Sequence, residues 1–115
     1  MKPKVQFRLR IYRDDSIVIG PGKVALLEAI AETGSISAAA RHIGMSYRRA
    51  WVLIDETNKG LKSPVVDTAT GGSRGGGTAL TPMGLELIRR YRAVEEKARE
   101  AAATDIAALT RLLAP

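Results

Sequence analysis

The stretch over residues 34–61 constrains the fold of this chain most, because it reads as two short helices joined by a tight turn. Ser35 or Ser37 can cap the first helix, and Ser46 can cap the second, because a serine side-chain oxygen accepts a hydrogen bond from a free backbone N–H. Gly44 ends the first helix, since glycine takes the left-handed backbone conformation at little cost. Two helices with a short glycine-containing turn between them are typical of a helix-turn-helix.

The second helix of this pair has an apolar face and an N-terminus suited to DNA, and we expect it to end near Lys59, before Gly60. At about 100° per residue, four residues gather on the side that should pack on the helices behind it. They are Ala50, Leu53, Ile54 and Thr57. In a helix-turn-helix, the N-terminus of the second helix enters the DNA major groove. From the two helices we therefore expect DNA contacts by Ser37, Ser46, Tyr47, Arg48, Arg49 and Trp51, although Trp51 can instead pack under the hairpin that follows.

Two strands and a helix are predicted before this pair. Apolar and polar residues alternate over residues 5–12, which indicates a half-buried strand. Asp14 and Asp15 then read as a turn, and residues 17–19 as a short returning strand. A helix should run from Pro21 to about Thr33 before Gly34 ends it. Its apolar stripe consists of Val24, Leu27, Ile30 and Ala31.

A glycine-rich loop, TGGSRGGGT over residues 70–78, lies between two short apolar stretches at 65–68 and 79–80. Such a hairpin directly after a recognition helix has the layout of a wing. The loop nearly fits a nucleotide-binding phosphate loop, but Gly77 stands where that motif needs its lysine. A solvated hairpin without a function is the other alternative. As a wing, it would contact DNA phosphates or the minor groove through Gly72, Ser73, Arg74 and Gly75.

A long final helix is predicted from Thr81 and Pro82, with threonine as its cap and proline at its first position. It should run to about Ala103, and Thr104 can cap a short last turn. Apolar residues along it are spaced four and three apart, which is typical of a helix seam that binds a second copy. The predicted dimer interface consists of Leu87, Tyr91, Val94, Ala98, Ala101 and Leu109.

Composition excludes several classes of function. The formal net charge of +6 at pH 7 favours an anionic partner, either nucleic acid or an acidic membrane surface. No cysteine is present, and His42 is the only histidine, with no acidic pair near it in the sequence. We therefore expect no enzyme activity, no metal site and no cofactor. No apolar run approaches the roughly 18 residues of a membrane span, and no signal peptide is evident, so we expect a cytoplasmic protein without a membrane partner.

The segments GSISAAARHIGMSYRRAW and TATGGSRGGGTALTPMG, with the helix after them, resemble the N-terminal DNA-binding domain of the ModE family of molybdate-responsive regulators. The resemblance covers about residues 16–100, and its GS-x-S-x-AA helix is also similar to LysR-type regulators. It implies a winged helix-turn-helix that dimerises through flanking helices and binds a palindromic promoter element. ModE regulators commonly carry molybdate-binding modules after this domain. The 115 residues contain none, so we expect no molybdate binding by this chain alone.

The sequence thus predicts an α+β fold with an N-terminal β-hairpin, a glycine-rich wing and a long C-terminal dimerisation helix. Residues 1–80 should form the winged helix-turn-helix, and residues 81–115 a helical dimerisation extension of the same domain. The predicted function is sequence-specific binding of double-stranded DNA as a dimer, to regulate transcription. The alternative is a winged-helix module that binds another protein. Salt separates the two, because DNA binding weakens steeply as salt rises and an apolar protein contact does not.

Overall fold

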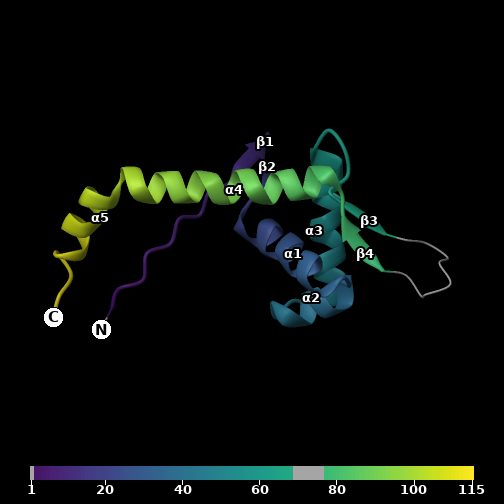
Figure 1. Ribbon diagram of the computed structural model, residues 1–115, viewed down its shortest axis with the longest axis horizontal. Helices are drawn as coiled ribbons and strands as arrows, with labels where there is room; N and C mark the ends of the chain where they lie inside the picture. The colour runs from purple at the N-terminus through teal and green to yellow at the C-terminus, as the bar shows by residue number, and fades with distance from the viewer. Residues whose placement is uncertain (1, 69–76) are drawn as a thin grey trace.

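The computed structural model describes residues 2–68 and 77–115. Its helices and strands form an α+β fold, which confirms the predicted class (Figure 1). The elements are β1 (Ile11–Arg13), β2 (Ser16–Ile19), α1 (Pro21–Thr33), α2 (Ile36–His42), α3 (Tyr47–Gly60), β3 (Val66–Thr68), β4 (Thr78–Leu80), α4 (Pro82–Ala101) and α5 (Ala103–Thr110). β1 pairs with β2, and β3 with β4, as two separate antiparallel hairpins.

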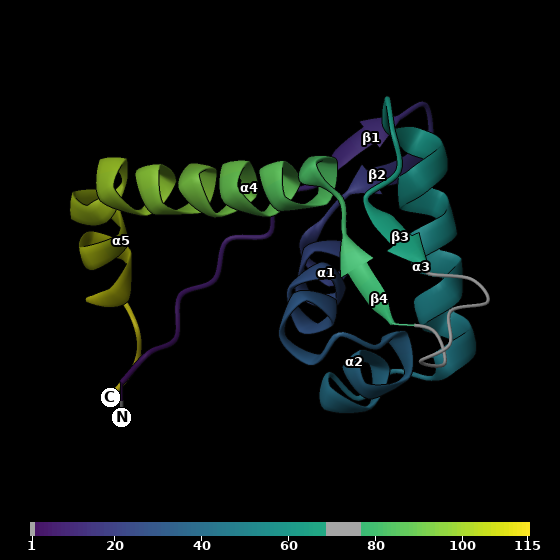
Figure 2. The same ribbon diagram turned by 45° about the vertical axis from the view of Figure 1, so that its right-hand side comes forward.

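Helices α1, α2 and α3 pack around one small hydrophobic core (Figure 2). Ala39 and Ala40 of α2 and Ala50 of α3 are buried, and their small side chains let the helix backbones approach closely. α1 contacts α2, α3, α4 and β4, so its buried face is wider than the predicted stripe. The buried apolar residues of α1 are Val24, Leu26, Leu27, Ala29 and Ile30. Ala31, predicted to belong to this stripe, is exposed.

The turn between α2 and α3 follows the predicted chemistry. Ser35, and not Ser37, caps α2, with its Oγ accepting a hydrogen bond from the Ala38 N–H at 3.1 Å. Gly44 has a φ of 72°, the left-handed region that favours glycine. Ser46 Oγ accepts from the Arg49 N–H at 3.0 Å and so begins α3. The serine caps and the glycine together fix how α3 is set against α2.

Gly60 has a different role from the predicted helix stop. α3 includes Gly60, and Leu61 is its C-cap. A Cβ at Gly60 would lie 2.6 Å from Cγ1 of Val18 in β2, which is closer than real side chains approach. Glycine is therefore needed because the last turn of α3 passes against the N-terminal hairpin.

The predicted strand over residues 5–12 is wrong for most of its length, because β1 covers only Ile11–Arg13. The partner strand β2 has four residues, so it can pair with only a few residues of the first strand. The residues just before β1 instead lie against α4, and the chain then leaves α4 toward the N-terminus (Figures 1 and 2). The Leu9 carbonyl accepts a hydrogen bond from the Tyr91 hydroxyl at 2.9 Å, and the Arg99 guanidinium lies 5.7 Å from the centre of the Phe7 ring.

The second hairpin connects the helix-turn-helix to α4. Val66 pairs with Leu80 and Thr68 with Thr78, so the two strands leave the core side by side. The Thr78 N–H donates to the Gly34 carbonyl at 3.0 Å, which ties β4 to the end of α1. Most of the predicted glycine-rich loop lies outside the described residues.

α4 begins on the core and then leaves it. Thr81 Oγ1 accepts from the Gly84 N–H at 3.1 Å and donates to the Pro64 carbonyl at 2.6 Å, which confirms the predicted cap. Leu87 and Tyr91 are buried, but no described residue of the chain beyond Tyr91 is. The far half of α4 and all of α5 extend from the body (Figure 1), and the molecule measures 57 × 31 × 24 Å. The cap expected at Thr104 is absent, because α5 already starts at Ala103.

Candidate nucleic-acid interface

The outward face of α3 is formed by the side chains opposite the core. Ala50, Leu53, Ile54 and Thr57 are buried, as their spacing predicts. Ser46, Tyr47, Arg48 and Arg49, at the start of the helix, are all exposed. These four predicted recognition residues therefore form an exposed surface at the N-terminus of α3.

Two aromatic residues on this surface contact each other. The rings of Tyr47 and Trp51 meet edge to face, with their centres 6.2 Å apart and their planes at 78°. Tyr47 is 56% exposed and Trp51 is 37% exposed, and Val52 beside them is also exposed. Trp51 is therefore not enclosed by the described part of the chain. Its predicted packing under the wing concerns residues outside that part.

Charges along α3 are arranged so that the acids are paired and the first arginines are not. Asp55 pairs with Lys59 one turn further on, at 2.9 Å. Glu56 pairs with Lys23 of α1 at 3.3 Å. Within residues 2–68 and 77–115, neither Arg48 nor Arg49 takes part in an ion pair. The positive charge at the N-terminus of α3 is thus free to attract an anion, and the amide dipoles of a helix start act in the same direction.

A second group of exposed polar residues lies on α2. Ser37 Oγ accepts a hydrogen bond from Arg41 one turn later, at 3.1 Å, and both residues are exposed. Sequence reasoning selected Ser37 but missed Arg41. The signal was available, because a basic residue four positions after an exposed serine shares its helix face.

Four predicted contact residues belong to the wing and lie outside the described residues. They are Gly72, Ser73, Arg74 and Gly75. The strands that flank this loop, β3 and β4, are formed close to where they were predicted. The role of the loop stays a prediction.

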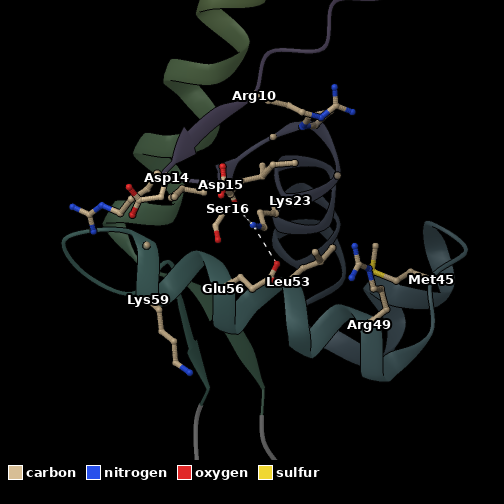
Figure 3. A pocket seen from close by; sticks show the side chains of 17 residues that line it. Arg10, Asp14, Asp15, Ser16, Lys23, Met45, Arg49, Leu53, Glu56 and Lys59 are labelled. Carbon is tan, nitrogen blue, oxygen red and sulfur yellow. Dashed lines mark hydrogen bonds and ion pairs between the residues drawn. The ribbon is translucent and has the colours of Figure 1, made fainter.

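A cleft of about 740 Å³ separates α3 from the N-terminal hairpin (Figure 3). Lys23 lies at its centre and is only 6% exposed. Its ammonium donates to the Ile17 carbonyl of β2 and pairs with Glu56 of α3. One lysine thereby joins three elements and holds the back of α3 in place. Sequence reasoning missed Lys23, although it shares a helix face with Leu27 and Ile30, and a charge in phase with an apolar stripe indicates burial.

The described residues offer little for other chemistry. Among them, no group of three or more His, Asp or Glu side chains could hold a metal ion. His42 is exposed near the end of α2. Across these same parts of the chain, every helix is too short or too polar to cross a membrane.

Comparison with known families agrees with this geometry. The family described as "Bacterial regulatory helix-turn-helix protein, lysR family" matches residues 22–85, which is more than half of the chain. The chain belongs to the lysR family of bacterial regulatory helix-turn-helix proteins. The match begins at the start of α1 and ends in the first turn of α4. It therefore includes the helix-turn-helix and the whole segment from β3 to β4.

Relatives of this lysR-family chain confirm the resemblance to ModE regulators. The molybdenum-pterin-binding protein MopB of Rhodobacter capsulatus is 53% identical over 77 residues, which is 67% of this chain and 28% of MopB. The DNA-binding transcriptional dual regulator ModE of Escherichia coli is 38% identical over 76% of this chain and 34% of its own length. The molybdenum transport protein ModE of Azotobacter vinelandii is 35% identical over 92% of this chain and 43% of its own length. The chain therefore spans less than half the length of these relatives.

A solved structure shares the fold of the lysR-family domain. The chain from the "Crystal structure of CbnR_DBD-DNA complex" superposes with a TM-score of 0.59 at 20% sequence identity. The alignment covers 76% of this chain and 95% of that one. The arrangement of helices and hairpin seen here is thus that of the winged helix-turn-helix fold.

Proposed function

We propose that this chain binds double-stranded DNA in a sequence-specific manner and regulates transcription, using the N-terminus of α3 as its reading surface. The observation that carries the proposal is the pairing of charges on α3. Asp55 and Glu56 are neutralised by lysines, while Arg48 and Arg49, at the exposed helix start, form no ion pair with any residue that the structure describes. A major groove admits one α-helix, and arginine is the residue that most often reads guanine there.

The other predicted contacts serve to position α3 on the duplex. Ser37 and its neighbour Arg41 are exposed on α2, where side chains can bind backbone phosphates. Ser46, Tyr47 and Trp51 lie beside the two arginines, and their polar atoms and rings suit sugar and base contacts. The wing would add Arg74 and the backbone amides of Gly72, Ser73 and Gly75 on phosphates or in the minor groove.

We further propose that two copies bind a palindromic operator as a dimer. The far half of α4 and α5 carry large apolar side chains that their own chain does not cover, Val94 at 47% exposed and Leu109 at 64%. Leu112 and Leu113, which follow α5, are also exposed. Large apolar patches on a small domain mark a site of association. Leu87 and Tyr91, which the sequence places on the same seam, are already buried in their own core, so a second copy would contact the later seam residues.

The relatives' names link them to molybdenum. We do not extend this link to the present chain, because the alignment covers only part of each relative. What carries over to this proposal is the DNA-binding domain. A second candidate function is a protein-binding surface on the same helix. Three large apolar side chains are exposed on α3, those of Tyr47, Trp51 and Val52. Such a surface suits a protein partner as well as DNA.

Selection of bound duplexes from a random pool, followed by affinity measurements at several salt concentrations, tests the proposal. We expect one enriched motif with two inverted half-sites. Its affinity should fall steeply with salt, because each phosphate contact contributes about 0.9 to the slope of log K against log salt. A pool without an enriched motif, or binding that is insensitive to salt, would favour the protein-binding alternative.

A further inference from the structure

The junction between α1 and α4 holds an ion pair that links residues 64 positions apart in the sequence. Arg92 donates from Nε to Oε2 of Glu28 at 2.9 Å and from a terminal nitrogen to Oε1 of Glu28 at 2.5 Å. Its other terminal nitrogen donates to Glu95 at 2.5 Å. All three nitrogens of one guanidinium are thus engaged, and two of them form a fork on a single carboxylate.

This pair occupies the point where α4 leaves the body of the domain. Tyr91, the neighbour of Arg92, is the last buried residue of the chain among those described, and its hydroxyl binds the Leu9 carbonyl. The Arg92 guanidinium also lies 5.6 Å from the centre of the Tyr91 ring. Beyond this residue no described residue of α4 is buried, so Tyr91 and Arg92 lie where the packing of α4 on the core ends.

We propose that Arg92 is a positioning residue whose fork on Glu28 sets the angle between α4 and the helix-turn-helix, and through it the separation of the two recognition helices in a dimer. The second part rests on the proposed function, whereas the first part concerns the single chain. A fork of two parallel hydrogen bonds fixes orientation in a way that one point charge does not.

A small change of this angle has a large effect further out. At 1.5 Å per residue, Glu100 lies about 12 Å along α4 from Arg92. A swing of about 20° at the junction would therefore move Glu100 by about 4 Å. Two half-sites on DNA are separated by about one helical turn, so an error of this size in each copy would spoil simultaneous binding.

The hydrogen bonds from Arg92 to Glu28 raise the pKa of the arginine above its ordinary value. The pair is nonetheless partly open to solvent, and exposed ion pairs contribute little to stability. The proposal therefore concerns direction and not folding. Melting temperatures of Glu28→Gln and Arg92→Lys should stay close to that of the parent chain, which keeps both variants usable.

The test measures the angle directly, in the absence of DNA. The chain has no cysteine, so Glu32→Cys on α1 and Glu100→Cys on α4 allow two spin labels without any other change. Labelled protein is diluted into an excess of unlabelled protein, and the label-to-label distance distribution within one chain is measured by pulsed electron resonance. Glu28→Gln and Arg92→Lys should shift its centre by several ångströms or broaden it about twofold.

Glu86→Gln is the matched control. It is the same chemical change on an exposed glutamate of α4 that binds two arginines, Arg89 and Arg90, both at 2.6 Å, but it joins nothing to α1. We expect this control to keep the parent distribution. If Glu28→Gln and Arg92→Lys also keep it, the fork does not set the angle and the inference is overturned.

A second readout connects the angle to DNA. The parent chain should bind two half-sites at one preferred spacing, and Glu28→Gln should flatten that preference while leaving single half-site affinity unchanged. Altered label distances with an unchanged spacing preference would overturn the link to the recognition helices. A parent chain that shows no gain from a second half-site would instead contradict the dimer proposal, and the label distances would still decide the role of Arg92.

Discussion

At the scale of single residues, Arg48 is the residue on which recognition of the DNA sequence should depend most. It is exposed at the start of α3, on the side opposite the buried residues of that helix. A bidentate contact between arginine and guanine contributes about 1–3 kcal/mol of discrimination against other bases. Arg48→Ala should therefore reduce the preference for the selected motif over random DNA by roughly fivefold to 150-fold, with a much smaller loss of random binding.

Competition binding of motif and random duplexes measures this ratio. Arg90→Ala, at an exposed position of α4 where the arginine pairs with Glu86, is the control and should leave the ratio unchanged. If Arg48→Ala retains both the preferred motif and the ratio, Arg48 does not read bases.

Gly84 gives a second prediction at this scale, because the backbone of the second hairpin lies against it. A Cβ at this position would stand 2.3 Å from the Val65 carbonyl oxygen, and a backbone atom cannot move aside as a flexible side chain can. Overpacking of this kind costs about 1–3 kcal/mol. Gly84→Ala should lower the free energy of unfolding by about that amount. Gly22→Ala, with open space around the same added atom, should leave it unchanged or slightly raised, as a denaturant titration will show.

Side-chain periodicity was enough to predict the buried face of α3, because a single helix fixes which residues share a side. The burial of Lys23 could not be predicted, for a different reason. Its burial depends on an acid on α3 and a carbonyl on β2, and both come from elsewhere in the chain. A sequence reveals the anomaly of a lysine on an apolar stripe, but not the partners that make its burial favourable.

At the scale of elements, helices were predicted to within a few residues because their caps and breakers are local. Ser46, Gly44 and Thr81 each act on the turn next to them. The strand expected over residues 5–12 was wrong for most of its length. Alternating apolar and polar residues indicate that an extended segment has one apolar and one polar face, but they do not indicate that another strand pairs with it. Here, one face of that segment lies on α4, through Phe7 and Leu9, and only β1 finds a strand to pair with.

The wing supplies the prediction at the scale of elements. Arg74 stands in a glycine-rich segment between β3 and β4, where the sequence predicts a phosphate contact. Arg74→Ala should weaken binding to all duplexes alike and reduce the salt slope by about one unit. Its free energy of unfolding should change by less than about 0.5 kcal/mol, because the sequence predicts no core role for this side chain.

Binding isotherms over a range of salt concentrations test this expectation. Lys62→Ala, an exposed lysine in the loop after α3, tests whether the loss of any nearby positive charge has the same effect. Unchanged affinity and salt slope in Arg74→Ala would mean that the wing does not contact DNA.

At the scale of the whole molecule, the sequence could not predict where the core ends along α4. The seam from Leu87 to Ala101 has one continuous spacing, yet its first two residues belong to the domain's own core and the later ones do not. The division depends on where α1 and the second hairpin meet α4. The pair of Arg92 and Glu28, whose members are 64 positions apart, lies at this boundary. Local patterns carry no information about such distant contacts.

The exposed half of α4 leads to the last prediction. Val94 is 47% exposed beyond the core, on the side that the seam would present to a second copy. Val94→Glu would place a charge in both halves of a two-fold interface, where burying an unpaired carboxylate is costly. The variant should sediment as a monomer at micromolar concentration while the parent chain sediments as a dimer. Its affinity for a paired site should fall towards that for a half-site, since the two contacts no longer act together.

Glu96→Lys provides the control, because it reverses a charge on the opposite side of the same helix and should leave the dimer intact. Thermal unfolding separates a lost interface from a lost fold, since Leu87 and Tyr91 keep the base of α4 on the core in the monomer. A parent chain that is monomeric in sedimentation would contradict the dimer. The exposed leucines at the C-terminal end, Leu109, Leu112 and Leu113, would then be available to another protein, and DNA binding would be limited to one half-site per chain.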